Sequence, residues 1–321
     1  MPRTSFFKEM PPYAKLMLSV GFILLSLIIC SVLSLALSVV IYHVKMDALL
    51  DPLNNIKEPG VFDSLNLMQT ISGIGTFIIP AFFLAFLMSE NTFDFLKLNR
   101  MAAVNSFLLV ALMILTMLPF INWLAEMNGR MALPSFLHGV ERWMRKSEDD
   151  NAELTKYFLD MHSTQAVVFN VIMIGLIPAI GEELLFRGII QRLFIEWTKN
   201  KHVAIFITAA LFSAIHIQFY GFIPRMLLGV LFGYLVVWSG SLWLAICGHF
   251  INNASAVIFT YLFRNDLSKI DPDTIGTEGT QWIATVVSGV LIIVTMILIK
   301  KIEERRNQIH PLIEQTLNTL E

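Results

Sequence analysis

Residues 164–192, TQAVVFNVIMIGLIPAIGEELLFRGIIQR, decide the fold. The stretch is long enough to cross a bilayer, because a spanning helix needs about 20 mostly apolar residues, yet its second half carries two adjacent acids and an arginine. The whole chain has the same apolar character: 55% of its 321 residues are hydrophobic, 15% are charged, and the mean hydropathy is +0.66. A soluble domain has about 25% charged residues. We therefore predict an all-α, polytopic membrane helix bundle.

Apolar windows of spanning length recur along the chain and predict about eight transmembrane helices. The first apolar run, Leu16 to Ile41, is longer than the apolar region of a secretory signal and is followed by no small-residue cleavage site, so we expect a retained anchor. The sixth and seventh windows are divided only by Ser239, Gly240 and Ser241, so seven spans are an alternative. The windows are 16–44, 65–89, 101–124, 164–192, 202–218, 223–239, 241–262 and 281–299.

The distribution of charge predicts the orientation and excludes one class of partner. Cytoplasmic loops of membrane proteins are enriched in Lys and Arg, and the larger share of the 23 such residues falls on the side of both termini. We expect a multi-pass protein of a bacterial inner or plasma membrane with both termini in the cytoplasm. The net charge of -2 argues against nucleic acid, so the expected partner is the lipid bilayer. Cys30 and Cys247 lie in apolar runs and imply no disulfide framework.

No repeat or flexible linker divides the chain, so we predict one membrane domain with three regions. Residues 1–159 hold the first three spans and a connecting loop, residues 160–262 form a core, and residues 263–321 hold the last span and a cytoplasmic tail. Within the loop, the stretch from Phe136 to Phe158 mixes apolar and charged residues at helical spacing. It lies in the membrane interface or forms a solvated connector helix.

The few polar side chains inside the spans are functional candidates, because a charge at mid-membrane costs about 2.5 to 3.5 kcal/mol. Glu183 and Arg187 are four residues apart in the favoured order for a helical ion pair. Glu182 points about 100° away from Glu183 and has no partner on its own helix. Apolar surroundings destabilise its ionised form, which suits a general base. The alternative is that both glutamates are structural.

Two further polar groups lie on the following spans. His216 ends the run FSAIH, and His249 begins the run HFINN, which places Asn253 one turn later on the same helical face. Two neutral donors aimed at one point would stabilise the oxyanion of an acyl-transfer reaction. The alternative for each histidine is a hydrogen bond between helices.

The sixth window begins with Arg225 and contains Gly229 and Gly233 at the spacing of a close helix contact. The glycines predict packing and carry no chemistry. Arg225 either extends its charge to the membrane interface or binds a substrate carboxylate.

Together the motifs EExxxR, FxxxH and HxxxN, in this order on consecutive spans, resemble the CPBP family, also called Abi or CAAX prenyl protease 2-like intramembrane proteases. The resemblance covers residues 160–262 and implies a glutamate-type endopeptidase with a site inside the bilayer that opens toward the cytoplasm and needs no cofactor. Its substrate would be a membrane-inserted, lipid-anchored or prenylated peptide. By the same resemblance, Glu182 and His216 activate water, His249 and Asn253 form the oxyanion site, and Glu183 with Arg187 is a supporting pair.

Three other functions remain open from the sequence. Glu182, His216 and His249 are a donor set typical of catalytic zinc, so a metalloprotease that performs the same hydrolysis is one alternative. A proton-coupled transporter is another, although no inverted repeat appears. A non-catalytic immunity or scaffold protein is the third. Serine and aspartic protease chemistry is not expected, because the sequence has no GxSxG motif and no Asp in any window.

Overall fold

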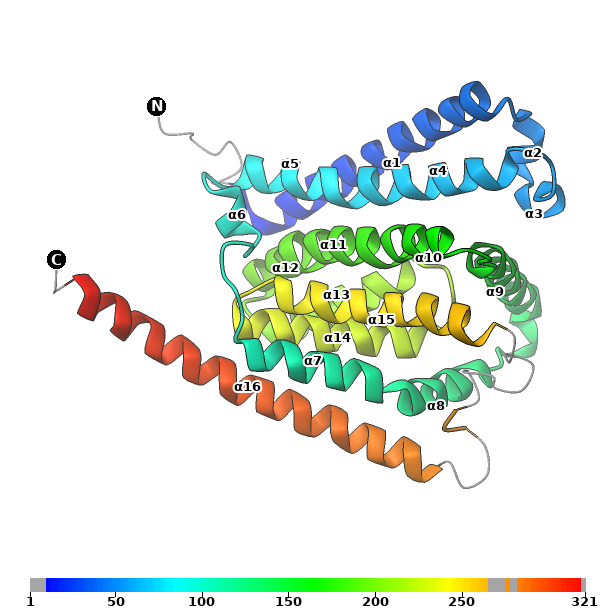
Figure 1. The fold of residues 1–321 in the computed structure, drawn as a ribbon. Helices are drawn as coiled ribbons and strands as arrows, with labels where there is room; N and C mark the ends of the chain where they lie inside the picture. The colour runs from blue at the N-terminus through cyan, green and yellow to red at the C-terminus, as the bar shows by residue number, and fades with distance from the viewer. Residues whose placement is uncertain (1–9, 265–274, 278–281, 319–321) are drawn as a thin grey trace.

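The computed structural model describes residues 10–264, 275–277 and 282–318. In these ranges the chain consists of helices joined by short loops, with no strand, so the predicted all-α class is confirmed. Helices in the membrane satisfy their own backbone hydrogen bonds, which is the condition for crossing a bilayer. Figure 1 shows the resulting bundle.

The helices fall into longer elements, most of which belong to spans, and short connectors. Two spans are continuous helices that carry π-helical segments, which are named η here: α4–η1–α5 and α10–η3–α11–η4–α12. The long elements are α1 (Pro12–Tyr42), α4 (Val61–Gly73), η1 (Ile74–Ile78), α5 (Ile79–Met88), α7 (Val104–Thr116), α8 (Leu118–Gly129), α9 (His138–Leu159), α10 (Thr164–Asn170), η3 (Val171–Leu176), α11 (Ile177–Glu183), η4 (Leu184–Ile190), α12 (Gln191–Thr198), α13 (Lys201–Ala214), α14 (Phe222–Ser239), α15 (Trp243–Phe263) and α16 (Trp282–Asn318). The short ones are α2 (Met46–Leu50), α3 (Pro52–Asn55), α6 (Thr92–Phe95) and the 3-10 helix η2 (Ser135–Leu137).

The described residues contain six helices that are long and apolar enough to cross a membrane, or seven if a bent pair is one span. The eight predicted windows all fall on helices, but not every window is a separate span of full length. The predicted count of about eight is therefore only approximate. The bent pair is α7 and α8, which meet at 49°. Pro119 in the first turn of α8 has no backbone N–H, and this explains the break. The fifth predicted window corresponds to α13, which has only 14 residues.

The boundary between the sixth and seventh windows is a true helix end. Gly240 adopts φ +66, the left-handed conformation that ends many helices and that glycine adopts without strain. Its N–H donates to the carbonyl of Val236, and Ser241 donates its hydroxyl to the carbonyl of Arg100. Therefore α14 and α15 are separate helices.

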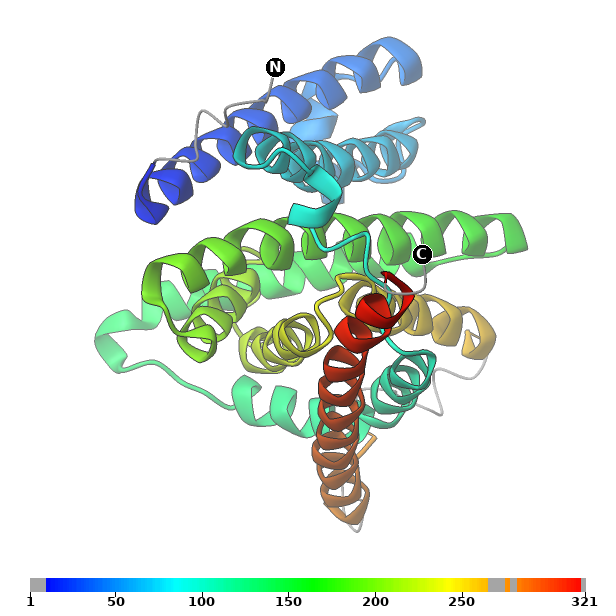
Figure 2. The same ribbon diagram turned by 90° about the vertical axis from the view of Figure 1, so that its left-hand side faces the viewer.

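The bundle has three layers (Figure 1). α1 and the α4–α5 span form an outer layer, and the α10–α12 span, α13, α14 and α15 form the centre. On the other side, α7, α8 and the oblique α16 cover α14 and α15, as Figure 2 also shows. The start of α1 and the end of α16 lie at one end of the bundle, and α2, α3 and α9 lie at the other.

The largest buried apolar cluster extends from α5 through α7, η4, α12, α13, α14 and α15 to α16, and it includes Leu84, Met113, Leu185, Phe232 and Ile299. Dense packing of this kind holds membrane helices together, since lipid itself is apolar. The centre of the bundle is thus a rigid frame for the polar groups on η4 and α15.

The loop between α6 and α7 gives a testable pH dependence. Lys97, which precedes α7 and lies outside the spans, donates to the carbonyl of Val236 at 3.4 Å. Burial lowers the pKa of Lys97 to about 8, and the charges of Arg192 and Arg100 act in the same direction. The unfolded chain therefore binds this proton up to a higher pH than the folded protein does. The free energy of unfolding should accordingly rise between about pH 8 and pH 10.5.

Lys97→Met should remove this rise, which thermal unfolding in detergent at pH 7, 9 and 10.5 would measure. Lys301→Met, which changes an exposed lysine on α16, is the matched control and should keep the pH dependence of the unmodified protein. If Lys97→Met and the unmodified protein show the same slope against pH, the assignment to Lys97 is wrong.

Candidate active site

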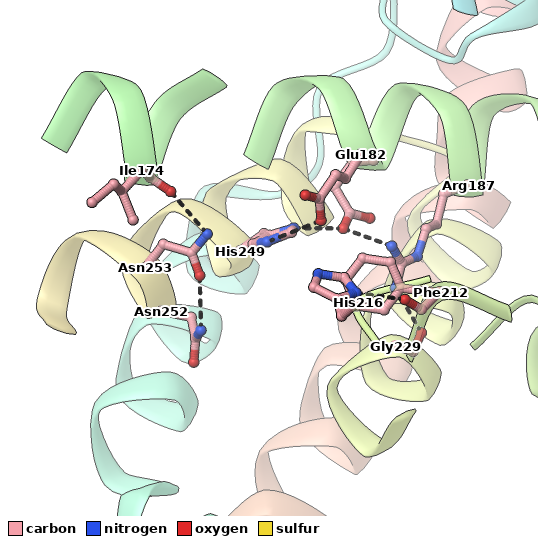
Figure 3. Close-up of polar contacts among 10 residues, drawn as sticks. Ile174, Glu182, Arg187, Phe212, His216, Gly229, His249, Asn252 and Asn253 are labelled. Atoms are coloured by element: carbon pink, nitrogen blue, oxygen red, sulfur yellow. Dashed lines mark hydrogen bonds and ion pairs between the residues drawn. The ribbon is translucent and has the colours of Figure 1, made fainter. Parts of the chain in front are cut away.

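The six residues singled out by the three sequence motifs come from neighbouring helices at the centre of the bundle (Figure 3). Glu182 and Glu183 end α11, and Arg187 lies in η4. His249 and Asn253 lie on α15, which packs against α11. His216 follows the end of α13. Four of the six are buried: the exposed fractions are 0% for Glu183, 2% for Arg187, 6% for His249 and 9% for Glu182.

The predicted pair of Glu183 and Arg187 is present, with 2.8 Å between Oε1 and Nη1. Arg187 also donates from Nη2 to the carbonyl of Gly229 at 3.1 Å. One turn later, Gln191 donates to the carbonyl of Gly233 at 3.2 Å. The two glycines of α14 therefore serve as backbone acceptors as well as packing positions. Gln191 was not recognised from the sequence, although its four-residue spacing from Arg187 is the signal that points to it.

The space at these glycines is too small for a side chain. A Cβ atom at Gly229 would lie 3.0 Å from Cβ of Ala209, and one at Gly233 would lie 2.7 Å from Oε1 of Gln191. The close helix contact that the two glycines predict is therefore confirmed, and the partner helix is α13. The same glycines bring the α14 backbone within reach of Arg187.

His249 lies between the two glutamates. Its Nδ1 is 2.8 Å from Oε1 of Glu183, and its Nε2 is 3.8 Å from Oε2 of Glu182. The ring of Phe232 stacks on the imidazole at 5.5 Å, which fixes the plane of the ring. Oε1 of Glu183 thus has two partners at 2.8 Å, Nδ1 of His249 and Nη1 of Arg187.

His216 contacts the backbone of the turn before it. Its Nδ1 lies 2.8 Å from the carbonyl of Phe212, so this nitrogen carries the proton and Nε2 is left as an acceptor. Within the described residues, no direct contact joins His216 to Glu182. The ring of Phe212 meets His216 at 5.1 Å and His249 at 6.0 Å, and Arg187 lies over its face at 4.6 Å. The sequence identifies Phe212 only as the first residue of a motif. In the structure its ring packs against His216, His249 and Arg187 and so lines the site.

Asn253 lies one turn after His249, as expected, but its amide group points to another helix. Nδ2 donates to the carbonyl of Ile174 in η3 at 3.2 Å, and Oδ1 accepts from Asn252 at 3.0 Å (Figure 3). In this state His249 and Asn253 share no hydrogen-bond partner. One N–H of the Asn253 amide remains for a ligand.

Two π-helical segments flank the glutamates on their helix. η3 contains Ile174 and precedes α11, while η4 contains Arg187 and follows it. Short π-helical segments within α-helices are frequent at functional sites, because the extra residue in the turn redirects the neighbouring side chains. The sequence pattern of apolar residues gave no sign of them.

The donor set proposed for zinc does not fit a metal in this structure. Among the described residues, no three His, Cys, Asp or Glu side chains are arranged to hold an ion. In addition, Nδ1 of His249 faces Glu183.

Comparison with known proteins gives one family and one relative. Residues 164–255 match the family described as Type II CAAX prenyl endopeptidase Rce1-like. The uncharacterized protein YpbD of Bacillus subtilis (strain 168) is 25% identical over 119 residues, which are 36% of this chain and 56% of that protein. The chain thus spans about half the length of this curated relative. No solved structure matches. The matched segment contains all three motifs, and the resemblance predicted from them is confirmed as a match of residues 164–255 to the Rce1-like family.

Proposed function

We propose that the protein is an intramembrane endopeptidase that hydrolyses a peptide bond of a prenylated, lipid-anchored or membrane-inserted substrate. One observation carries the proposal: the buried carboxylate of Glu182 has no ion-pair partner on its own helix and faces an imidazole that Glu183 contacts from the other side. A general base beside a fixed proton donor is the arrangement that water-dependent acyl transfer requires. The family match supports the same reaction.

In the proposed mechanism, Glu182 takes a proton from a water molecule, and the water oxygen attacks the scissile carbonyl carbon. His216 accepts from the same water through Nε2 and orients it. The electron pair of the carbonyl moves to its oxygen, and the N–H groups of His249 Nε2 and Asn253 stabilise the oxyanion. The intermediate then collapses, the C–N bond breaks, and Glu182 returns the proton to the leaving amine. A positioned base and oxyanion donors each contribute roughly 10²- to 10⁴-fold in rate.

Glu183 has a more direct role in this scheme than a structural partner of Arg187. Its contact with Nδ1 holds the imidazole of His249 so that Nε2 points toward Glu182. Because Arg187 binds the same oxygen of Glu183, the ion pair keeps that carboxylate in place. We therefore assign Glu183 and Arg187 as positioning residues for His249.

The proposal is tested with the purified protein in nanodiscs and a fluorescent, prenylated peptide. Mass spectrometry should find two fragments, and in ¹⁸O-labelled water one ¹⁸O atom should enter the new carboxyl terminus. If the peptide stays intact with the protein folded, the proposed activity is wrong for this substrate class. If no label enters, water is not the nucleophile.

Treatment with a strong chelator should leave the rate of cleavage unchanged, because the mechanism uses only side chains and water. A zinc enzyme would lose its activity when the metal is removed, and added zinc would restore it. Such a loss and recovery would replace the proposed mechanism by the metal-dependent one.

A further inference from the structure

The aromatic ring of Phe232, on α14, lies over the face of the His249 imidazole. The two ring centroids are 5.5 Å apart and the ring planes differ by 22°, so the rings are stacked. The ring of Phe212 meets the same imidazole at 6.0 Å and at 88°, which is an edge contact. Phe232 is 1% exposed. The imidazole is therefore enclosed by one parallel ring and one perpendicular ring.

Close packing determines where the ring of Phe232 lies. A Cβ atom at Gly248 would be 3.0 Å from Cε1 of Phe232, so this ring packs against the α15 backbone one residue before His249. The guanidinium carbon of Arg187 is 5.7 Å from the centre of the same ring. Contacts this close disfavour any other rotamer of Phe232, because a packed interior has no space for a displaced ring.

Gln191 holds the backbone that carries Phe232. Its Nε2 donates to the carbonyl of Gly233, the residue that follows Phe232, at 3.2 Å. One turn earlier on both helices, Arg187 donates to the carbonyl of Gly229 at 3.1 Å. Gln191 is 2% exposed, and the loss of a buried donor leaves its acceptor unpaired. The two bonds therefore fix the turn of α14 that contains Phe232 against the helix that contains the glutamates.

We propose that Phe232 is a positioning residue that holds the imidazole of His249 with Nδ1 on Glu183 and Nε2 toward Glu182, and that Gln191 acts through Phe232. The inference rests on the proposed function. The torsion about Cβ–Cγ of a histidine is broad and has no strong preference of its own, so the neighbouring groups set it. Rotation about this bond moves both ring nitrogens at once. A ring that turns therefore loses its contact with Glu183 and its direction toward Glu182 together.

The kinetic test compares substitutions at Phe232 and Gln191. Phe232→Leu keeps an apolar side chain but removes the stacked ring, so kcat for the prenylated peptide should fall roughly 10- to 100-fold, the effect of a misplacement of about 1 Å. KM should stay unchanged, since Phe232 is buried and does not reach the substrate. Gln191→Met should lower kcat roughly 3- to 10-fold, which corresponds to one lost hydrogen bond. The double variant should be no slower than Phe232→Leu alone.

A second measurement follows the imidazole itself and needs no cleavage. Protein labelled with ¹⁵N-histidine in nanodiscs should show a low-field proton resonance for Nδ1–H of His249, because this nitrogen lies 2.8 Å from a carboxylate oxygen. His249→Gln should remove the resonance and thereby assign it. Phe232→Leu should shift or broaden it. Gln191→Met leaves the apolar core intact and should shift the same resonance, so it carries the test if Phe232→Leu does not fold.

Phe194→Leu is the matched control, because Phe194 of α12 is also buried and its ring stacks on another aromatic ring, that of Trp197. It should keep both kcat and the resonance. An unchanged resonance in Phe232→Leu overturns the proposal, whatever the rate, and so does a raised KM with kcat unchanged. Additive losses in the double variant contradict the route from Gln191 through Phe232. If the resonance shifts but the unmodified protein cleaves no peptide, the proposed function alone is wrong.

Discussion

Glu182→Gln is expected to abolish peptide hydrolysis and to leave the fold intact. The amide has the size of the carboxylate but accepts no proton from water, so the rate should fall by roughly 10²- to 10⁴-fold. Stability should change little, because the 3.8 Å between Oε2 of Glu182 and Nε2 of His249 is longer than a hydrogen bond. The initial rate of cleavage of the prenylated peptide, with the melting temperature in the same nanodiscs, measures both effects.

Glu196→Gln is the matched control, since Glu196 lies on the same continuous helix, away from the site, and forms an ion pair with Lys15 of α1. It should keep the rate. A full rate in Glu182→Gln would show that another group activates the water. Glu182→Gln also separates the other functions suggested by the sequence. A scaffold protein would keep its function in this variant. A proton-coupled transporter would lose transport, and its unmodified form would cleave no peptide. In cells, new protein termini near hydrophobic segments should appear with the unmodified protein and not with the variant.

Arg187→Met is expected to produce the largest loss of stability. The substitution leaves Glu183 charged and fully buried, and breaking a buried ion pair from one side costs about 3 to 5 kcal/mol. It also removes the donor to the carbonyl of Gly229 and the guanidinium from the face of Phe212. Denaturant unfolding in detergent gives the free energy of unfolding.

The double variant Glu183→Gln with Arg187→Met should be more stable than Arg187→Met alone, because it leaves no buried charge without a partner. Breaking the exposed pair of α8 by Arg130→Met is the control and should cost about 0 to 1 kcal/mol. If Arg187→Met costs no more than this control, the buried pair is not the structural element described here.

The sequence predicts the spans well, and the differences have local causes. The apolar window 202–218 continues past the end of α13, because hydropathy does not register that Ile217 adopts φ +53, a conformation that no helix continues. In the window 101–124, Pro119 is the visible signal for the bend between α7 and α8. The pattern of apolar residues thus predicts which segment is helical, but the residue at which the helix ends depends on backbone conformation.

The site is predictable where its contacts lie within one helix and not where they cross between helices. The pair of Glu183 and Arg187 follows from their four-residue spacing. The position of His249 between two glutamates depends on how α15 packs against α11, which spacing along the chain does not determine. The resemblance implies that His216 and Glu182 activate one water molecule together, and in the structure Nδ1 of His216 binds the carbonyl of Phe212. The roles of His216, His249 and Asn253 remain predictions.

The two predictions about sidedness point in opposite directions. The loop after His216 contacts α9 through the carbonyl of Ile217 and the N–H of Tyr220. α9 lies at the end of the bundle opposite to the start of α1 and the end of α16 (Figure 1). Termini in the cytoplasm would therefore turn this loop away from the cytoplasm, whereas the family resemblance implies an opening toward it.

The shortness of α13 has a consequence for the surrounding lipid. Its 14 residues rise only about 21 Å, whereas the hydrocarbon layer is about 30 Å thick. Phe206 and Leu211 are exposed on its surface, so we expect acyl chains to contact this helix directly. Where a helix is shorter than the layer, the bilayer thins locally or polar headgroups descend beside it. The proposed hydrolysis of an anchored chain needs water and an acyl or prenyl tail at the same depth, and we expect a thinned bilayer beside α13 to bring the two together.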